Sequence, residues 1–125
     1  MSGATLDAGA LIAFERNERA VVSLVARAYE RGERLAVPTG VVAQAWRDGR
    51  RQVRLVRLLA APITDIVPLD DRTARAVGQL CGATGTNDVV DVSVVRCAQE
   101  RGHPVLTSDI DDLRRIAPEL RLIQI

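Results

Sequence analysis

The chain has 125 residues, of which 47% are hydrophobic and 2% aromatic, so we expect a single domain, residues 1–125, with an aliphatic core. Seventeen arginines and no lysine stand against sixteen acidic residues, for a net charge of +1. This balance excludes a protein held on nucleic acid by its net charge, although it permits a local basic patch. The absence of lysine excludes any mechanism that needs a catalytic lysine.

The sequence carries no mark of export or membrane insertion. The first residues lack the basic region of a signal peptide, and no apolar run approaches the ~20 residues that a membrane helix needs. Cys81 and Cys97 lack the spacing of metal ligands and are expected to be small buried thiols in a reducing compartment. We therefore expect a soluble cytoplasmic protein with no membrane partner.

Short apolar strands alternate with helices along the chain. Strands are expected at residues 4–6, 35–37, 63–67, 105–107 and 121–125. Helices are expected at residues 8–14, 17–31, 38–47, 50–60, 70–81, 88–101 and 112–117, with a glycine- and threonine-rich turn at 82–86. This alternation predicts βαβ units in an α/β fold, with a parallel sheet of four or five strands covered by helices on both faces.

Asp7 is the only charged side chain between Met1 and Phe14, and it follows the first expected strand. It can cap the helix that begins at Ala8, because aspartate is a favoured N-cap. It can also belong to a functional site, and one side chain can do both.

The helix over residues 88–101 carries an acid on its apolar side. At ~100° per residue, one side gathers polar residues and the other apolar ones. The polar side holds Ser93, Arg96, Gln99 and Glu100, and the apolar side Val90, Val94, Val95 and Ala98. Asp91 lies within the apolar side, where an ionised carboxylate costs several kcal/mol unless it is compensated. Asp88, three residues earlier, is open to a purely capping role.

More acids follow the strand at residues 105–107. Asp109 lies at its carboxyl end, where open α/β sheets place their sites, and Asp112 is a second candidate. Asp111 is expected to be solvated. Carboxylates that converge there repel one another, raise their pKa values or bind a cation, and we favour the cation. The single histidine, His103, is expected at the surface of a turn rather than as a general base.

Residues 47–57 are rich in arginine. They form either a solvated helix face or a surface that contacts a phosphate backbone, because the planar guanidinium grips phosphate in two places. Few aromatic residues are present to stack on bases, so base-specific recognition is poorly supported. The candidate RNA-binding residues are Arg47, Arg50, Arg51, Arg54 and Arg57.

Three segments, LDAGALIA at Asp7, NDVVDVSVVRCA at Asp91 and VLTSDIDDL at Asp109, occur in this order over nearly the whole chain. In these segments the chain resembles the PIN-domain nucleases, and in particular the toxins of bacterial VapBC-type toxin–antitoxin pairs. The resemblance implies an α/β/α sandwich, a Mg²⁺ or Mn²⁺ site of clustered acids, and cleavage of RNA phosphodiesters. It also implies a homodimer that a cognate antitoxin holds inactive.

The resemblance assigns the catalytic and metal-binding roles to Asp7, Asp91 and Asp109, with Asp88 and Asp112 as further candidate ligands. Metal ions in such a site lower the pKa of a bound water and clamp the phosphate oxygens, so no protein nucleophile is required.

The chain departs from the family at one acid. The family usually has a glutamate in the helix after the second strand, and VVAQAWRDG places Gln44 there. An amide oxygen can ligate a hard cation but brings no charge, so metal affinity should fall. The alternative function is therefore a catalytically weak or inactive domain of this fold that binds RNA or protein. A phosphoacceptor receiver domain is disfavoured because it typically needs a lysine.

Overall fold

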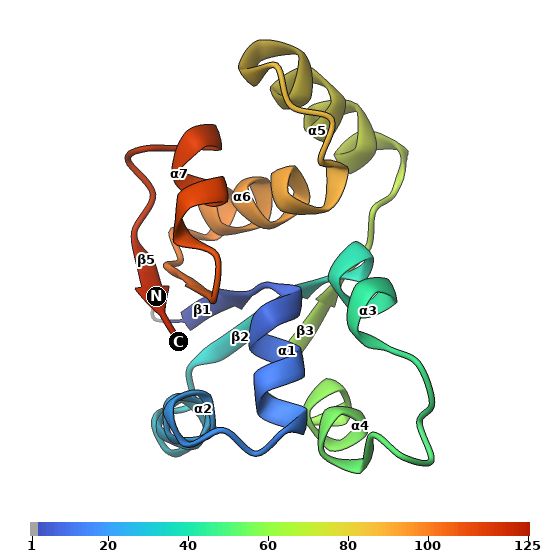
Figure 1. Ribbon diagram of the computed structural model, residues 1–125, viewed down its shortest axis with the longest axis vertical. Coiled ribbons are helices and arrows are strands. Elements are labelled where there is room, and N and C mark those ends of the chain that lie inside the picture. Colours follow the sequence, from blue (N-terminus) through green and yellow to red (C-terminus); the bar gives the residue numbers. More distant parts are fainter. Residues whose placement is uncertain (1–2) are drawn as a thin grey trace.

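A computed structural model describes residues 3–125 (Figure 1). The elements in chain order are β1 (Gly3–Leu6), α1 (Ala8–Glu15), α2 (Arg19–Arg31), β2 (Arg34–Pro38), α3 (Thr39–Ala45), α4 (Val53–Ala60), β3 (Thr64–Val67), α5 (Asp71–Thr84), α6 (Val89–Arg101), β4 (Val105–Thr107), α7 (Ile110–Ile116) and β5 (Leu122–Gln124). Within this range, no helix is both long and apolar enough to cross a membrane.

The five strands form one sheet in the order β3-β2-β1-β4-β5, and every neighbouring pair is parallel. Helices α1, α2 and α4 cover one face, α6 and α7 cover the other with α5 packed on α6, and α3 lies at the edge where the strands end (Figure 1). The predicted three-layer α/β/α sandwich is therefore confirmed. The chain leaves β1 in one direction to form β2 and returns on the other side to form β4, so the strand order reverses beside β1. Ligand sites in such sheets lie at this reversal, beyond the carboxyl ends of the strands.

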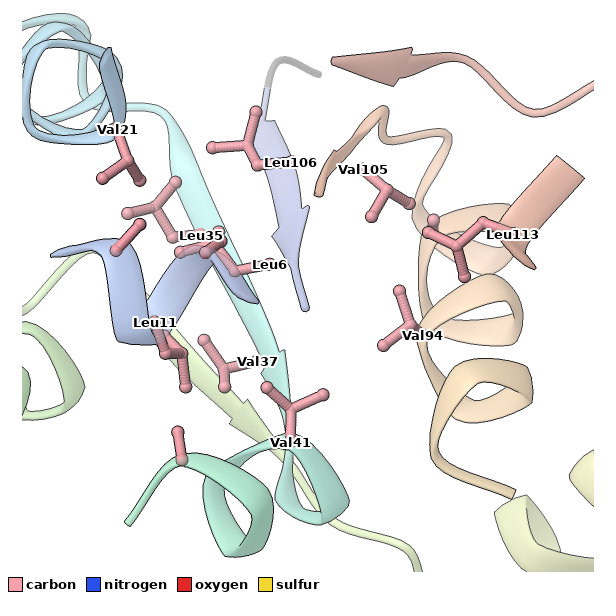
Figure 2. Packing of buried hydrophobic residues seen from close by; sticks show 14 of the residues in the cluster. Leu6, Leu11, Val21, Leu35, Val37, Val41, Val94, Val105, Leu106 and Leu113 are labelled. Atoms are coloured by element: carbon pink, nitrogen blue, oxygen red, sulfur yellow. The ribbon is translucent and has the colours of Figure 1, made fainter. Parts of the chain in front are cut away.

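Aliphatic side chains fill both interfaces between the sheet and the helices. Leu6, Val37 and Val105 are fully buried in the three central strands. Figure 2 shows Leu11 of α1 and Val94 of α6 approaching these strands from opposite faces. Burial on both faces explains why the central strands read as nearly continuous apolar runs. Each such side chain contributes roughly 1.5–3 kcal/mol when it leaves water, so an aliphatic core of this size holds the layers together.

Several element boundaries differ from the sequence prediction. Helix α2 begins at Arg19 because Asn17 adopts a left-handed backbone with φ 60°. Helix α5 continues through most of the expected turn to Thr84. Gly85, whose φ is 74°, caps its carboxyl end. Helix α7 begins at Ile110, two residues earlier than expected.

Helix α4 begins at Val53 rather than at residue 50, because Gln52 holds the preceding residues in a loop. The Oε1 atom of Gln52 accepts hydrogen bonds from the backbone N–H groups of Arg47 (2.7 Å) and Asp48 (3.0 Å). Its Nε2 atom donates to the carbonyl of Ala45 (2.9 Å). Residues 46–52 are therefore a loop fixed by one amide side chain.

Two burial predictions were wrong. Ser93 was expected on the solvent side of α6, yet it is buried and donates to the carbonyl of Val89 at 2.8 Å, because α6 is enclosed by α5 and α7 as well as by the sheet. His103 was expected at the surface, yet it is buried with its Nδ1 3.3 Å from the hydroxyl of Thr5. It precedes β4 and so lies at the amino end of the sheet, opposite the edge at which Asp7 and Asp109 follow their strands.

Glu15, the last residue of α1, caps a helix that lies 40 residues later in the chain. Its Oε2 accepts from the backbone N–H of Leu55 at 2.7 Å, in the first turn of α4, where Gln52 provides no side-chain cap. A carboxylate at a helix N-terminus satisfies an otherwise orphaned donor and opposes the positive end of the helix dipole.

We expect Glu15→Ala to lower the free energy of unfolding by about 1 kcal/mol, because it leaves the Leu55 N–H without its acceptor. Glu15→Gln keeps an acceptor oxygen and should lose less. Urea denaturation at constant m-value measures both changes. The matched control is Glu18→Ala, since Glu18 is exposed and makes no side-chain cap bond. Equal losses for Glu15→Ala and Glu18→Ala would show that the cap contributes nothing.

Candidate metal centre

Asp7 follows β1 and is buried, with 8% of its surface exposed. Its Oδ1 accepts from the backbone N–H of Ala10 at 2.9 Å, so it caps α1 as predicted. Burial is the largest effect on its carboxyl group and raises the pKa, a hydrogen bond with the Thr107 side chain lowers it, and the charge of Asp109 raises it. Asp7 is therefore both a cap and a member of an acidic cluster.

Asp109 comes beside Asp7 because β1 and β4 are neighbouring parallel strands, with Leu6 in register with Leu106. The backbone N–H of Asp7 donates to the carbonyl of Leu106 at 3.3 Å. Asp109 follows two residues after β4 and its side chain is exposed. The structure thus brings Asp7 and Asp109 together at one edge of the sheet, as expected from the strand ends.

Thr107 connects these two acids, and sequence reasoning did not single it out. It is fully buried at the end of β4, its side chain lowers the pKa of the Asp7 carboxyl group, and its Oγ1 accepts from the backbone N–H of Asp109 at 2.8 Å. The signal available in the sequence was a hydroxyl residue at the end of an apolar strand, two positions before an acid. One hydroxyl therefore fixes the backbone of Asp109 and favours the ionised form of Asp7.

Gly9 allows the close approach of the two loops that carry these acids. A Cβ at Gly9 would lie 2.1 Å from Oγ of Ser108 and 3.4 Å from Oδ1 of Asp7. A side chain there would force the Ser108 hydroxyl to turn away and would crowd Asp7, so the glycine helps to keep the two segments close.

Asp91 and Asp88 occupy the first turn of α6, where Asp88 is the N-cap and its Oδ1 accepts from the backbone N–H of Asp91 at 3.0 Å. The capping role of Asp88 is confirmed. Asp91 is half-buried, and burial is the main reason that its pKa rises to about 7, followed by the negative charge of Asp88. Asp112 and Asp109 raise the pKa of Asp91 further. The inward position predicted for Asp91 is correct.

Asp112 lies in the first turn of α7 and joins the two groups of acids. A hydrogen bond with the side chain of Asp109 is the largest effect on its carboxyl group and raises the pKa, with Asp88 acting in the same direction. Arg115 opposes them from 3.4 Å. Asp111 is exposed, as expected for a solvated residue.

The acids form a row rather than a closed cage. Asp88, Asp91 and Asp112 line a cleft of about 320 Å³, together with Thr84, Gly85, Thr86, Arg115 and Ile116, whereas Asp7 and Asp109 are not part of that lining. Among the residues that the structure describes, no three acids, histidines or cysteines are grouped closely enough to form a metal-binding set. The donors are all oxygens that raise one another's pKa, which fits a hard divalent cation and does not fit a soft one.

Gln44 is exposed on α3, whose one face meets the start of α6. A Cβ at Gly40 would lie 3.3 Å from Cγ2 of Val90, the neighbour of Asp91. Because residues four apart share a helix face, Gln44 lies one turn beyond Gly40 on the side of α3 that approaches the acids. This position supports the correspondence between Gln44 and the acid of the resembling family.

The five arginines are exposed but do not form a single helix face. Arg47 donates to the carbonyls of Ala43 (3.1 Å) and Trp46 (2.6 Å), and Arg51 lies 3.8 Å from Asp48. Arg54 and Arg57 are on α4, and Arg57 also lines an apolar groove between α2 and α4. Within residues 3–125, Arg50, Arg54 and Arg57 form no ion pair.

Comparison with known proteins agrees with this geometry. A family model described as the PIN domain matches residues 4–118. The crystal structure of VapBC2 from Rickettsia felis bound to a DNA fragment from their promoter aligns with a TM-score of 0.71 and 15% identity, covering 98% of both chains. The crystal structure of FitAcB from Neisseria gonorrhoeae aligns with a TM-score of 0.64 and 16% identity, over 97% of this chain and 96% of that one. A structure of FitAB bound to an IR36 DNA fragment aligns with a TM-score of 0.65 and 18% identity, over 97% of this chain and 94% of that one.

No curated protein matches the sequence. The structural relatives are below 25% identity and show a shared fold. The family model spans nearly the whole chain. It includes β1 and β4, the two strands that are followed by Asp7 and Asp109. The chain belongs to the PIN domain family.

Proposed function

We propose that the protein is a divalent-metal-dependent endoribonuclease that acts in the cytoplasm as the toxin of a type II toxin–antitoxin pair. The observation that carries the proposal is Asp91, a half-buried carboxylate whose pKa is raised to about 7 by burial and by three neighbouring acids. Acids held together against their own repulsion, at the edge of a PIN-domain sheet, are suited to bind a cation. PIN domains are generally nucleases, which agrees with this chemistry.

Asp7, Asp91 and Asp109 would hold Mg²⁺ or Mn²⁺, with Asp88, Asp112 and Gln44 at the margin of the site. A bound divalent cation would supply a water of lowered pKa and positive charge for the phosphate oxygens. Residues of the chain orient the donors: Ala10 N–H holds Asp7, Thr107 fixes the backbone of Asp109, and Asp88 fixes the first turn of α6 and so positions Asp91. No serine or cysteine nucleophile is required.

A second candidate function follows from Gln44. If the amide replaces the acid of the family, the site has one negative charge fewer, and a binding module for RNA or protein with weak or no catalysis becomes the alternative. The Asp91 and Gln44 variants below separate the two functions.

The proposed partners are RNA, a cognate antitoxin protein and a second copy of the chain in a homodimer. The antitoxin proposal is supported by the structural relatives, which are VapBC2 and FitAB complexes. The apolar groove of about 370 Å³ between α2 and α4, bordered by the exposed Tyr29, is a surface that a protein partner could cover.

For Asp91→Asn we expect loss of Mn²⁺-dependent RNA cleavage and a gain in the stability of the metal-free protein. The native pKa of about 7 lies above the unfolded value of about 3.9, so between these values the native state binds more protons. Stability therefore falls as pH rises through that window, and the penalty is complete above it. In chelator at pH 8 the variant should be more stable by about 1–2 kcal/mol, and near pH 4 the difference should vanish.

Thermal unfolding at both pH values and an RNA cleavage assay measure these effects. Asp111→Asn, at an exposed acid of the same segment, is the control and should change neither quantity. A destabilised Asp91→Asn protein that still cleaves RNA would assign Asp91 to structure alone.

For Gln44→Glu we expect Mn²⁺ binding to tighten by about tenfold and nuclease activity to rise, because the ion would face one more negative oxygen. The helix should tolerate the change, since glutamate and glutamine have similar helix propensity. Calorimetric titration of the metal-free protein measures the affinity. Gln79→Glu, on the exposed side of α5, is the matched control. Unchanged affinity in Gln44→Glu would place Gln44 outside the metal centre.

For the triple variant Arg50→Ala, Arg54→Ala, Arg57→Ala we expect weaker RNA binding and a shallower salt dependence. Each lost phosphate contact should reduce the slope of log K against log salt by about 0.7 for a single strand, so by about 2 in total. Fluorescence anisotropy with a labelled RNA across a salt series gives the slope. Alanines at Arg19, Arg27 and Arg31 of α2 form the control. Equal slopes in the two variants would make the Arg50–Arg57 segment an ordinary solvated surface.

A further inference from the structure

The only tryptophan of the chain, Trp46, lies at the carboxyl end of α3 with 40% of its surface exposed. Its backbone N–H donates to the carbonyl of Val42 at 2.8 Å, which closes the helix. The ring is exposed where the chain leaves α3 for the loop before α4, and a large aromatic side chain with this exposure is not explained by the core.

Gly49 supports one side of the indole ring. A Cβ at Gly49 would lie 2.8 Å from Cζ2 and 3.1 Å from Cη2 of Trp46, so the six-membered ring rests against the glycine backbone. An alanine there would displace the ring. The glycine therefore lets the ring lie against the loop while part of its surface remains in solvent.

The backbone that carries the ring is fixed. Gln52 makes three hydrogen bonds across residues 45–48, and the Arg47 guanidinium donates to the carbonyl of Trp46 at 2.6 Å. Asp48 holds the next turn, since its Oδ1 accepts from the N–H of Arg50 at 3.0 Å. An aromatic ring on a fixed backbone loses little conformational entropy when it binds a ligand.

The segment that carries the ring is rich in positive charge. Four exposed arginines lie within residues 46–54 and one acid, Asp48, lies among them; the arginines are Arg47, Arg50, Arg51 and Arg54. An exposed aromatic ring within a basic surface is the combination that binds single-stranded nucleic acid, because the ring stacks on a base while the cations contact phosphates. A second copy of the chain docked through the same loop would bring these arginines against their own copies, which is unfavourable.

We propose that Trp46 stacks on an unpaired base of single-stranded RNA while the neighbouring arginines contact its phosphates. This inference rests on the proposed ribonuclease function and adds to it a specific contact, an aromatic ring that can stack only on an exposed base. The ring contributes stacking and no charge, whereas the arginines contribute charge and depend on salt. The two contributions are therefore separable by experiment.

The experiment measures binding of a 12-nucleotide single-stranded RNA to the whole protein in chelator, so that no cleavage occurs. Because the chain has one tryptophan, its intrinsic fluorescence reports directly on Trp46. We expect RNA to quench this fluorescence, and a duplex of the same sequence to quench it much less. Trp46→Ala should weaken binding of the single strand by about tenfold with an unchanged salt slope, and Trp46→Phe should retain most of the affinity.

Leu69→Ala is the control, because Leu69 is a large side chain that is also 40% exposed, lies between β3 and α5 outside the arginine-bearing loop, and its truncation should leave affinity unchanged. Circular dichroism melting establishes that each variant is folded. If Trp46→Ala does not fold, Trp46→Phe is used for the test instead. The proposal is overturned if RNA binds without quenching, if Trp46→Ala binds as the native chain does, or if the change acts by dissociating a dimer in sedimentation. If only this inference is wrong, the native protein still cleaves RNA in the presence of Mn²⁺. If the proposed function is wrong, the native protein shows no such cleavage.

Discussion

The repulsion among carboxylates at the ends of β1 and β4 is the constraint on which the site depends. Burial, followed by like charge, raises the pKa of Asp7 and Asp91, and a hydrogen bond with Asp109 and its negative charge raise the pKa of Asp112. The fold therefore holds these carboxyl groups where their ionised forms are disfavoured. The aliphatic core supplies the free energy that opposes this cost, because its strands are buried on both faces. A site built from mutual repulsion is poised to gain stability from a positive ligand.

The acids that could be predicted from the sequence are those whose position follows from local geometry. Asp7 and Asp109 follow apolar strands, and Asp91 lies on the apolar side of a helix, so strand ends and helical angles suffice. Ser93 and His103 were misplaced because their burial depends on neighbours that the local pattern does not contain. Ser93 is on α6, which α5 and α7 enclose, and His103 lies beside β1. The role of Thr107 depends on the pairing of β1 with β4 and was not visible either.

The loop between α3 and α4 shows the same limit. The sequence suggested a helix from residue 50, whereas the Gln52 side chain bonds three backbone groups and fixes a loop. Side chains that bond the backbone locally compete with helix formation, and this competition decides the boundary. Its result is that Trp46 and the arginines belong to a fixed loop and a short helix rather than to one long helical face.

Helix α1 has an acid at each end, and this gives it a second role. Asp7 bonds the N–H of Ala10 at its beginning, and Glu15 at its end bonds the N–H of Leu55 in α4. Eight residues at 1.5 Å each make α1 a spacer of about 12 Å between the acids and the amino end of the arginine-bearing helix. Because both ends are anchored by hydrogen bonds, the separation between these two surfaces is set by the length of a helix and does not vary with the motion of a loop.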